Sequence, residues 1–248
     1  MSKKYQVSIG ILLGLLFMPK TVFAMHIMEG FLPPIWCIAW GAICIPFVFV
    51  GLFSIKEKIK VNPKMKMLIA MVGAFAFVLS ALKIPSVTGS CSHPTGVGLG
   101  SILFGPLVMS VLGLIVLIFQ ALLLAHGGIT TLGANTFSMA VVGPIVSYFL
   151  YKLLKKMKVS QSITVFTSAM IGDLMTYITT AIELSLAFPD ATGGVMTSLI
   201  KFMGIFALTQ IPLAISEGLL TVIIFNLLTK YNKKELRELK VLSEEDLK

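Results

Sequence analysis

The sequence predicts an all-α polytopic membrane protein with about seven transmembrane helices, judged by the length that a helix needs to cross a bilayer. Hydrophobic residues make up 56% of the chain and charged residues only 12%, with a mean hydropathy of +0.95. This balance is far from that of a soluble domain. The net charge of +9 lies in short lysine clusters between apolar blocks, which is typical of cytoplasmic loops. A nucleic-acid partner is therefore not expected.

Residues 1–24 are predicted to be a cleavable signal peptide. A lysine pair at 3 and 4 precedes an apolar run over 7–18, and Val22-Phe23-Ala24 offers the small residues that signal peptidase reads. An uncleaved first membrane helix is the alternative, but the run is short and is interrupted by Pro19-Lys20. Residues 25–248 would then form a single transmembrane domain that begins at Met25 and ends in a short cytoplasmic tail.

The mature chain is predicted to cross the membrane through a series of apolar blocks. These blocks are 35–54, 67–82, 97–125, 132–154, 163–186 and 196–228. Lysines cluster after the first, fourth and last blocks, which places those connections in the cytoplasm. The mature N-terminus then lies outside the cell and the C-terminus inside.

The third block requires a break. An odd number of crossings must separate the external His93 from the cytoplasmic Lys155, and two unbroken blocks would give an even number. Gly105-Pro106 is the natural position, because proline cannot continue a helix. We expect a short or partly re-entrant piece before it and a full span after it, with the irregular backbone covered by protein.

The chain has three histidines, and this topology brings all of them to the external side. Imidazole is the commonest transition-metal ligand, and nitrogen donors suit nickel, cobalt or copper. If Met25 is the first residue, its amine can chelate one metal ion together with the backbone nitrogen and imidazole of His26, and His93 can add a fourth nitrogen. His126, which is flanked by glycines, is interpreted as closer to a structural role. Helix capping or loop support is the alternative for each histidine.

Carboxyl groups within the apolar blocks need an explanation, because charge is costly inside a membrane. Asp173 and Glu183 share one block, and Glu217 lies midway along the last. They either serve a proton or ion path, as in a secondary transporter, or cap broken helices and pair with basic groups of another subunit. Glu29 is either a hydrogen-bond partner of an external histidine or an exposed side chain.

Several chemistries are disfavoured by missing motifs. The sequence contains no Walker motif, so an ATPase that drives transport would be another polypeptide. It also has no HExxH pair, which argues against an intramembrane metal-dependent hydrolase with Glu29 as its base. The cysteines show no CxxC pairing, and the seven-residue spacing of Cys37 and Cys44 favours helix packing.

Three segments carry a resemblance to a known family: Met25-His26-Ile27-Met28-Glu29-Gly30-Phe31-Leu32-Pro33, Gly89-Ser90-Cys91-Ser92-His93-Pro94-Thr95-Gly96, and Ala125-His126-Gly127-Gly128 through Gly133-Ala134-Asn135. They resemble the substrate-binding membrane component of cobalt energy-coupling factor transporters, the CbiM type, whose close relative serves nickel. The resemblance implies a fold like that of the S-components of these transporters, with an added N-terminal helix. It also implies Met25, His26 and His93 as the metal ligands.

The same resemblance implies function and partners. The substrate would be Co(II), imported for cobalamin synthesis, and a nickel-specific component of the same transporter class is the alternative. The partners would be a transmembrane coupling protein, a cytoplasmic ABC-type ATPase and a small accessory membrane protein, all within the lipid bilayer or bound to it. No organic cofactor and no catalytic residue are implied.

Overall fold

The computed structural model describes residues 26–82, 84–85, 91–239 and 241. The predicted signal peptide and Met25 lie outside the described residues. The helices are α2 (Pro34–Val61), α3 (Met65–Ala81), α4 (Val97–Phe104), α5 (Pro106–Leu124), α6 (Leu132–Asn135), the π-helix η1 (Thr136–Val142), α7 (Gly143–Lys156), α8 (Gln161–Ala187), α9 (Gly194–Tyr231) and α10 (Lys233–Glu238). A short antiparallel hairpin of β1 (Ile84–Pro85) and β2 (Cys91–Ser92) pairs Ile84 with Ser92 and Pro85 with Cys91. The all-α class is confirmed.

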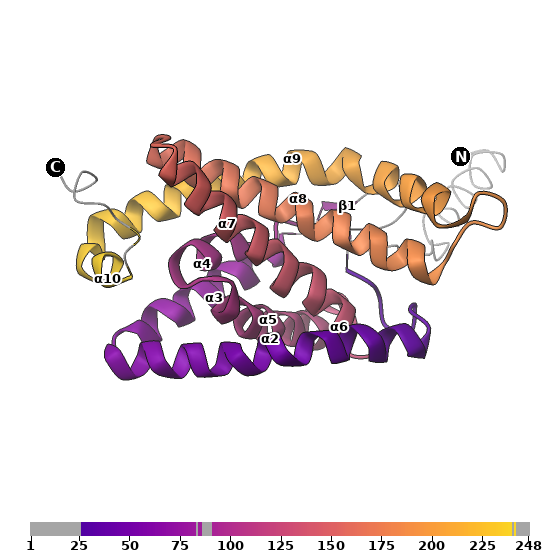
Figure 1. The fold of residues 1–248 in the computed structure, drawn as a ribbon, viewed down its shortest axis with the longest axis horizontal. Helices are drawn as coiled ribbons and strands as arrows, with labels where there is room; N and C mark the ends of the chain where they lie inside the picture. The colour runs from indigo at the N-terminus through magenta and orange to yellow at the C-terminus, as the bar shows by residue number, and fades with distance from the viewer. Residues whose placement is uncertain (1–25, 83, 86–90, 240, 242–248) are drawn as a thin grey trace, which may run out of the picture.

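The polytopic membrane character is also confirmed. Within the described ranges, five helical segments are long and apolar enough to cross a membrane, and α3 is a shorter apolar helix. The segments are Pro34–Val61, Pro106–Leu124, Leu132–Lys156, Gln161–Ala187 and Gly194–Tyr231. Proline lies in the first turn of α2 and α5, where its missing N–H leaves no helical bond unmade. In Figure 1, α2 runs along one side of the bundle while α8 and α9 run along the opposite side.

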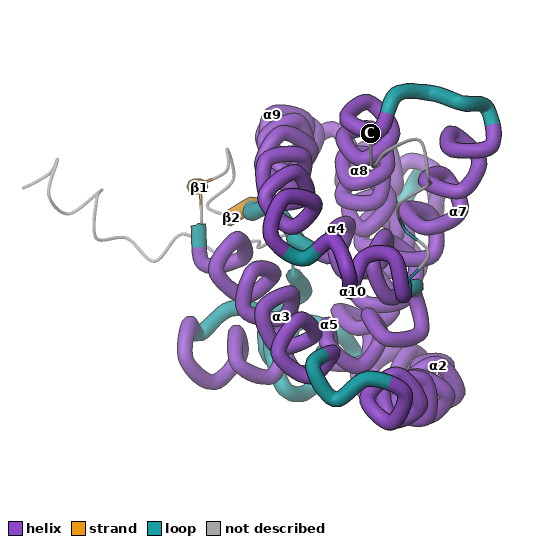
Figure 2. The backbone as a smooth tube through the Cα atoms, turned by 90° about the vertical axis from the view of Figure 1, so that its left-hand side faces the viewer, coloured by secondary structure: helices purple, strands orange, loops and turns teal. Residues whose placement is uncertain are grey.

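The predicted break at Gly105-Pro106 is confirmed. α4 ends at Phe104, Gly105 has φ +88, and α5 starts at Pro106. The positive φ favours glycine, which has no Cβ. All residues of α4 are buried, and Figure 2 shows α4 in the middle of the bundle with other helices around it. At a rise of 1.5 Å per residue α4 is about 12 Å long, so it enters the bundle without crossing it.

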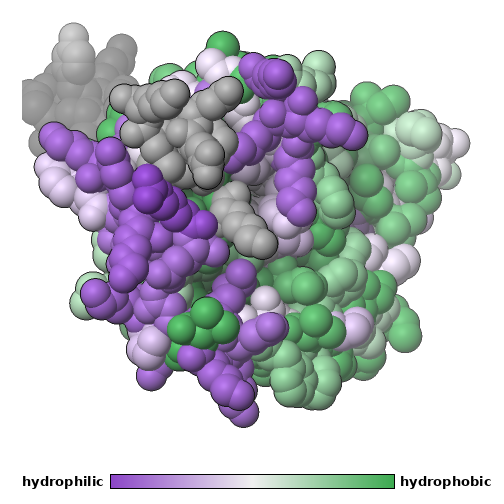
Figure 3. Space-filling model, turned by 60° about the vertical axis from the view of Figure 1, so that its left-hand side comes forward, coloured by the Kyte–Doolittle hydropathy of each residue, from purple (hydrophilic) through white to green (hydrophobic). Residues whose placement is uncertain are grey.

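The lysine-rich connections gather at one end of the bundle. They join α2 to α3, α7 to α8, and α9 to α10, and they share the left-hand end of Figure 1. Figure 3 shows hydrophilic residues over this end and hydrophobic residues over the side wall. This pattern fits a protein whose side walls contact lipid and whose lysine-rich end lies in water.

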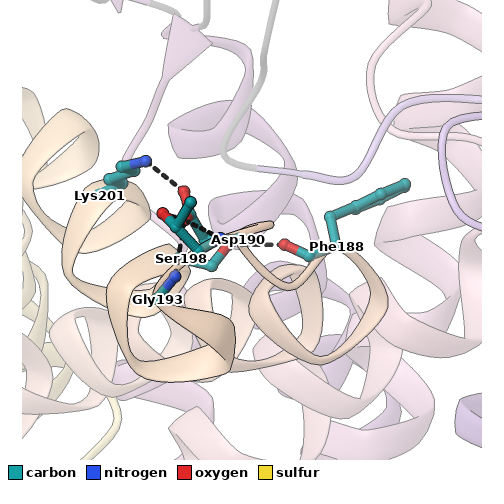
Figure 4. Close-up of polar contacts among 6 residues, drawn as sticks. Phe188, Asp190, Gly193, Ser198 and Lys201 are labelled. Atoms are coloured by element: carbon teal, nitrogen blue, oxygen red, sulfur yellow. Dashed lines mark hydrogen bonds and ion pairs between the residues drawn. The ribbon is translucent and has the colours of Figure 1, made fainter.

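At the opposite end, Asp190 organises the connection between α8 and α9 (Figure 4). Its Oδ1 accepts hydrogen bonds from the backbone N–H groups of Thr192 and Gly193, both at 3.0 Å. Its Oδ2 forms an ion pair with Lys201 of α9. The Lys201 ammonium, followed by these N–H donors, holds the pKa of the Asp190 carboxyl well below its usual range.

The substitution D190N is expected to lower the Tm of the purified protein at pH 7 by roughly 1–3 °C, a small effect because the pair is exposed to solvent. Since the folded-state pKa is depressed, the carboxylate stabilises the fold above its unfolded pKa of about 3.9. This contribution is lost as the pH falls through the folded-state value. Thermal unfolding at pH 7 and at pH 3 checks the sign. The control E57Q removes an exposed carboxyl on α2, and an equal loss in E57Q would contradict the prediction.

Candidate metal centre

Three imidazole rings from three separate segments meet inside the bundle. The ring centroids of His26 and His93 are 4.8 Å apart, those of His26 and His126 are 5.0 Å apart, and those of His93 and His126 are 4.8 Å apart. One ligand nitrogen from each ring lies within 4.8 Å of the others. All three side chains are buried, with exposures of 0%, 0% and 3%. Converging buried nitrogen donors are the arrangement that binds a transition-metal ion.

The segment that carries His26 is held by Asn135 at the end of α6. The Ile27 N–H donates to Asn135 Oδ1 at 2.8 Å, and Asn135 Nδ2 donates to the Ile27 carbonyl at 3.0 Å. The Thr131 hydroxyl donates to the same carbonyl at 2.6 Å. The π-helix η1 begins directly after Asn135, and π-helical turns often occur at functional sites. We call the segment that carries His26, residues 26–33, the N-terminal arm.

Glu29 fastens the same arm to the connection between α5 and α6. Its side chain is exposed, which was one of the two alternatives, and its Oε2 accepts hydrogen bonds from the backbone N–H groups of Ile129, at 2.5 Å, and Thr130, at 3.1 Å. Interactions with Thr130 lead those that hold the pKa of Glu29 below its usual value. A Cβ at Gly128 would lie only 2.5 Å from the Glu29 Cα, so the close approach requires glycine there.

If the three histidines bind a transition-metal ion, the substitution E29Q is expected to weaken that binding roughly 10-fold, the lower end of the effect of residues that support metal ligands. The amide keeps one acceptor oxygen but loses the charge that attracts the two N–H donors. Competition between the protein and a chelator for Co(II) measures the change, with E57Q as the control. Unchanged affinity in E29Q would mean that Asn135 and Thr131 hold the N-terminal arm without help from the Glu29 carboxylate.

His93 lies between β2 and α4 and presents a defined nitrogen. Its Nδ1 is 2.8 Å from the Pro94 carbonyl oxygen. Since a carbonyl only accepts, Nδ1 carries the proton and donates to it. Nε2 is then the nitrogen whose lone pair can bind a metal. On the preceding residue, the Ser92 hydroxyl is 2.8 Å from that of Thr209 on α9.

His126 joins the cluster although the sequence reasoning placed it closer to a structural role. It follows Ala125, the left-handed residue that ends α5, and its N–H donates to the Gln120 carbonyl at 3.2 Å. At this helix end the His126 ring lies 5.0 Å from the ring of His26 and 4.8 Å from that of His93. The counting of crossings that put His126 on the same side as His26 and His93 was the signal that could have found it.

The structure thus brings together two of the three predicted ligands and adds His126. Met25 lies outside the described residues, so its amine remains a predicted donor. The predicted set of Met25, His26 and His93 therefore stays a prediction as a whole, because only its two histidines lie among the described residues.

The three carboxyl groups within the helices have different surroundings. Glu217 of α9 accepts from the Thr95 N–H and hydroxyl, so it holds the backbone just before α4, and its interpretation as a helix cap stays a prediction. Asp173 of α8 accepts from Gln210 Nε2 at 2.5 Å. Glu183 is buried in α8, and neither of its carboxyl oxygens has a hydrogen-bond partner among the described residues.

The fold and the cluster together define an integral membrane protein with a buried cluster of three imidazoles that could hold a metal ion. The family model that matches residues 26–235 is CbiM, described as the cobalt uptake substrate-specific transmembrane region. The chain belongs to this family. It is therefore a component of a cobalt uptake transporter and not an enzyme.

Relatives and solved structures agree with this assignment. The chain is 60% identical to a cobalt transport protein CbiM of Ruminiclostridium cellulolyticum over 97% of each chain. It is 62% identical to the protein of the same name from Moorella thermoacetica, over 94% of this chain and 90% of that one. A crystal structure of a transition metal transporter is similar with a TM-score of 0.73 and 29% identity, covering 84% of this chain and 94% of that chain.

Proposed function

We propose that this chain captures Co(II) at the external face of the cell membrane. The four donors would be the amine of Met25, the backbone nitrogen and imidazole of His26, and the imidazole of His93. The observation that supports this proposal most strongly is the convergence of the buried histidines from three separate segments. Four nitrogens in this arrangement also suit Ni(II), so the metal preference must be measured.

The chelate requires removal of residues 1–24. Only a new N-terminus gives Met25 a free amine, and that amine and the His26 amide nitrogen then close a five-membered ring around the ion. The amide nitrogen and the His26 Nδ1 close a six-membered ring. His93 would supply Nε2, the nitrogen left with a lone pair by the bond to the Pro94 carbonyl.

The orientation and partners follow from the same proposal. The lysine-rich end would face the cytoplasm, with the C-terminus there and the mature N-terminus outside. A transmembrane coupling protein, an ABC-type ATPase and a small accessory membrane protein would complete an energy-coupling factor transporter. ATP hydrolysis would then drive release of cobalt inside the cell for cobalamin synthesis. The absence of a Walker motif from the sequence supports a separate ATPase.

One sample tests the proposal. The mature protein is purified from its membrane, and its intact mass, N-terminal sequence and metal content are determined together. The expected result is a chain that begins at Met25 and carries about one cobalt ion per chain, as four donors for a single ion imply. Competition with Ni(II) then gives the preference. A chain that keeps its leader and holds no metal would overturn the amine-ligand proposal.

A further inference from the structure

Glu217 lies at the point where the His93 loop, residues 92–96, turns into α4. Its Oε2 accepts from the Thr95 N–H at 2.5 Å, and its two carboxylate oxygens lie 3.1 and 3.0 Å from the Thr95 hydroxyl. Both Thr95 and Glu217 are fully buried. A buried carboxylate that accepts from both the N–H and the hydroxyl of one residue makes a strong, directional contact. It fixes the residue two positions after His93.

Both donors belong to Thr95, which lies two positions before the start of α4 inside the bundle. The first N–H groups of a helix have no partner within it, and in a membrane interior no bulk water replaces that partner. The Glu217 carboxylate, which is hydrogen-bonded to Thr95, also lies close to the first turn of α4, since a Cβ built on Gly98 would be 3.6 Å from Glu217 Oε1. The Thr95 hydroxyl lies 3.5 Å from the Val97 nitrogen. Together, Glu217 and Thr95 support the backbone where α4 begins.

The two histidine segments are held by different helices. Ser92 contacts Thr209 and Thr95 contacts Glu217, so α9 holds the His93 loop on both sides of His93. The N-terminal arm is held instead by Asn135 and Thr131, around α6. The separation of the His26 and His93 rings, 4.8 Å between centroids, is therefore set by the position of α9 relative to α6.

We propose that Glu217 is a positioning residue for metal capture, which fixes His93 to α9 through Thr95 while α6 fixes His26. This inference rests on the proposed function, since it presumes that both histidines bind one metal ion. A shift of α9 against α6 would separate the two ligands and release the ion. Glu217 thereby links the metal site to the helix that would have to move.

Three variants isolate the contact. E217Q keeps the side-chain volume but removes the negative charge and leaves one acceptor oxygen, instead of two, for the Thr95 N–H and hydroxyl. T95V removes the side-chain hydroxyl and keeps the backbone N–H. T95S keeps both the hydroxyl and the N–H. E183Q is the matched control, because it removes a buried carboxyl of α8 whose oxygens have no hydrogen-bond partner in the described part of the chain.

Co(II) binding by competition and the visible absorption spectrum of the Ni(II)-loaded protein are the two readouts. E217Q and T95V should weaken Co(II) binding by about 10–100-fold, the range for residues that orient metal ligands, and should shift the Ni(II) spectrum. T95S should stay within about threefold of the wild type, as should E183Q. If E217Q and T95V lower the Tm yet leave affinity and spectrum unchanged, the inference is wrong and the contact is structural only.

The wild type and H93A separate this inference from the proposed function. If the processed wild type binds no Co(II), or if H93A binds it as tightly, the proposed function and the inference both fail. If H93A loses the metal while E217Q and T95V keep wild-type affinity and spectrum, only the inference fails. Where E217Q does not fold, T95V carries the test, because valine is close to threonine in shape.

Discussion

H93A and H26A are each expected to reduce Co(II) affinity by at least about 100-fold, beyond the range seen for residues that only support ligands. Each substitution removes a buried imidazole that the proposed set of four donors requires. H126A should have a smaller effect, because the proposed amine, amide and two imidazoles already supply four nitrogens. Competition with a chelator of known affinity measures all three variants.

The histidine series needs a fold control. Replacement of a buried imidazole by alanine can leave a cavity that destabilises the protein, so the Tm and the monodispersity of each variant must accompany its affinity. The milder H126A serves as the matched comparison, since it creates a similar cavity in the same cluster. An H126A effect as large as that of H93A would contradict the four-donor set and make His126 a ligand.

Retention of the leader is expected to abolish metal binding. A24F places a bulky residue where signal peptidase requires a small one, so the amine of Met25 would stay in a peptide bond. The chelate would then lose the amine that closes its five-membered ring, and the purified protein should hold less than about one tenth of the wild-type cobalt. Intact mass and metal analysis of the same sample check both steps.

An engineered protease site provides the control for the A24F variant. When a protease site is engineered so that digestion of the A24F protein leaves Met25 as the first residue, cobalt binding should return. Recovery shows that the loss came from the blocked amine and not from misfolding. A leader-retaining protein that binds Co(II) as tightly as the processed form would rule out the Met25 amine as a ligand.

Topology was the part of the fold that the sequence predicted best. Apolar block length and lysine clusters are local patterns with a direct physical meaning, and counting crossings located the break at Gly105-Pro106. The same argument placed three histidines at one end. The argument could not predict which histidine side chains lie close together. The left-handed end of α5 at Ala125 depends on packing and not on composition.

The supporting contacts were less accessible from the sequence. Glu217 was recognised as an acid within an apolar block, with two open interpretations. Only the structure shows that it is hydrogen-bonded to Thr95, which lies 122 positions away in the sequence. The contacts of Asn135 with Ile27, 108 positions apart, are of the same kind. Pairings over such separations depend on which helices are neighbours, and a single sequence without homologues does not specify this.

The complete burial of His26 and His93 has a consequence for how long an ion stays. A chelator in solution cannot touch an ion held by side chains that have no contact with bulk water. Exchange must then wait for the protein to open, and the rate of metal loss becomes independent of chelator concentration once the chelator is in excess. Residence time is thus governed by the opening of the bundle, while equilibrium affinity is governed by the donors. If the chain captures metal as proposed, it would retain its ion until the bundle opens, however strong the competing ligand outside.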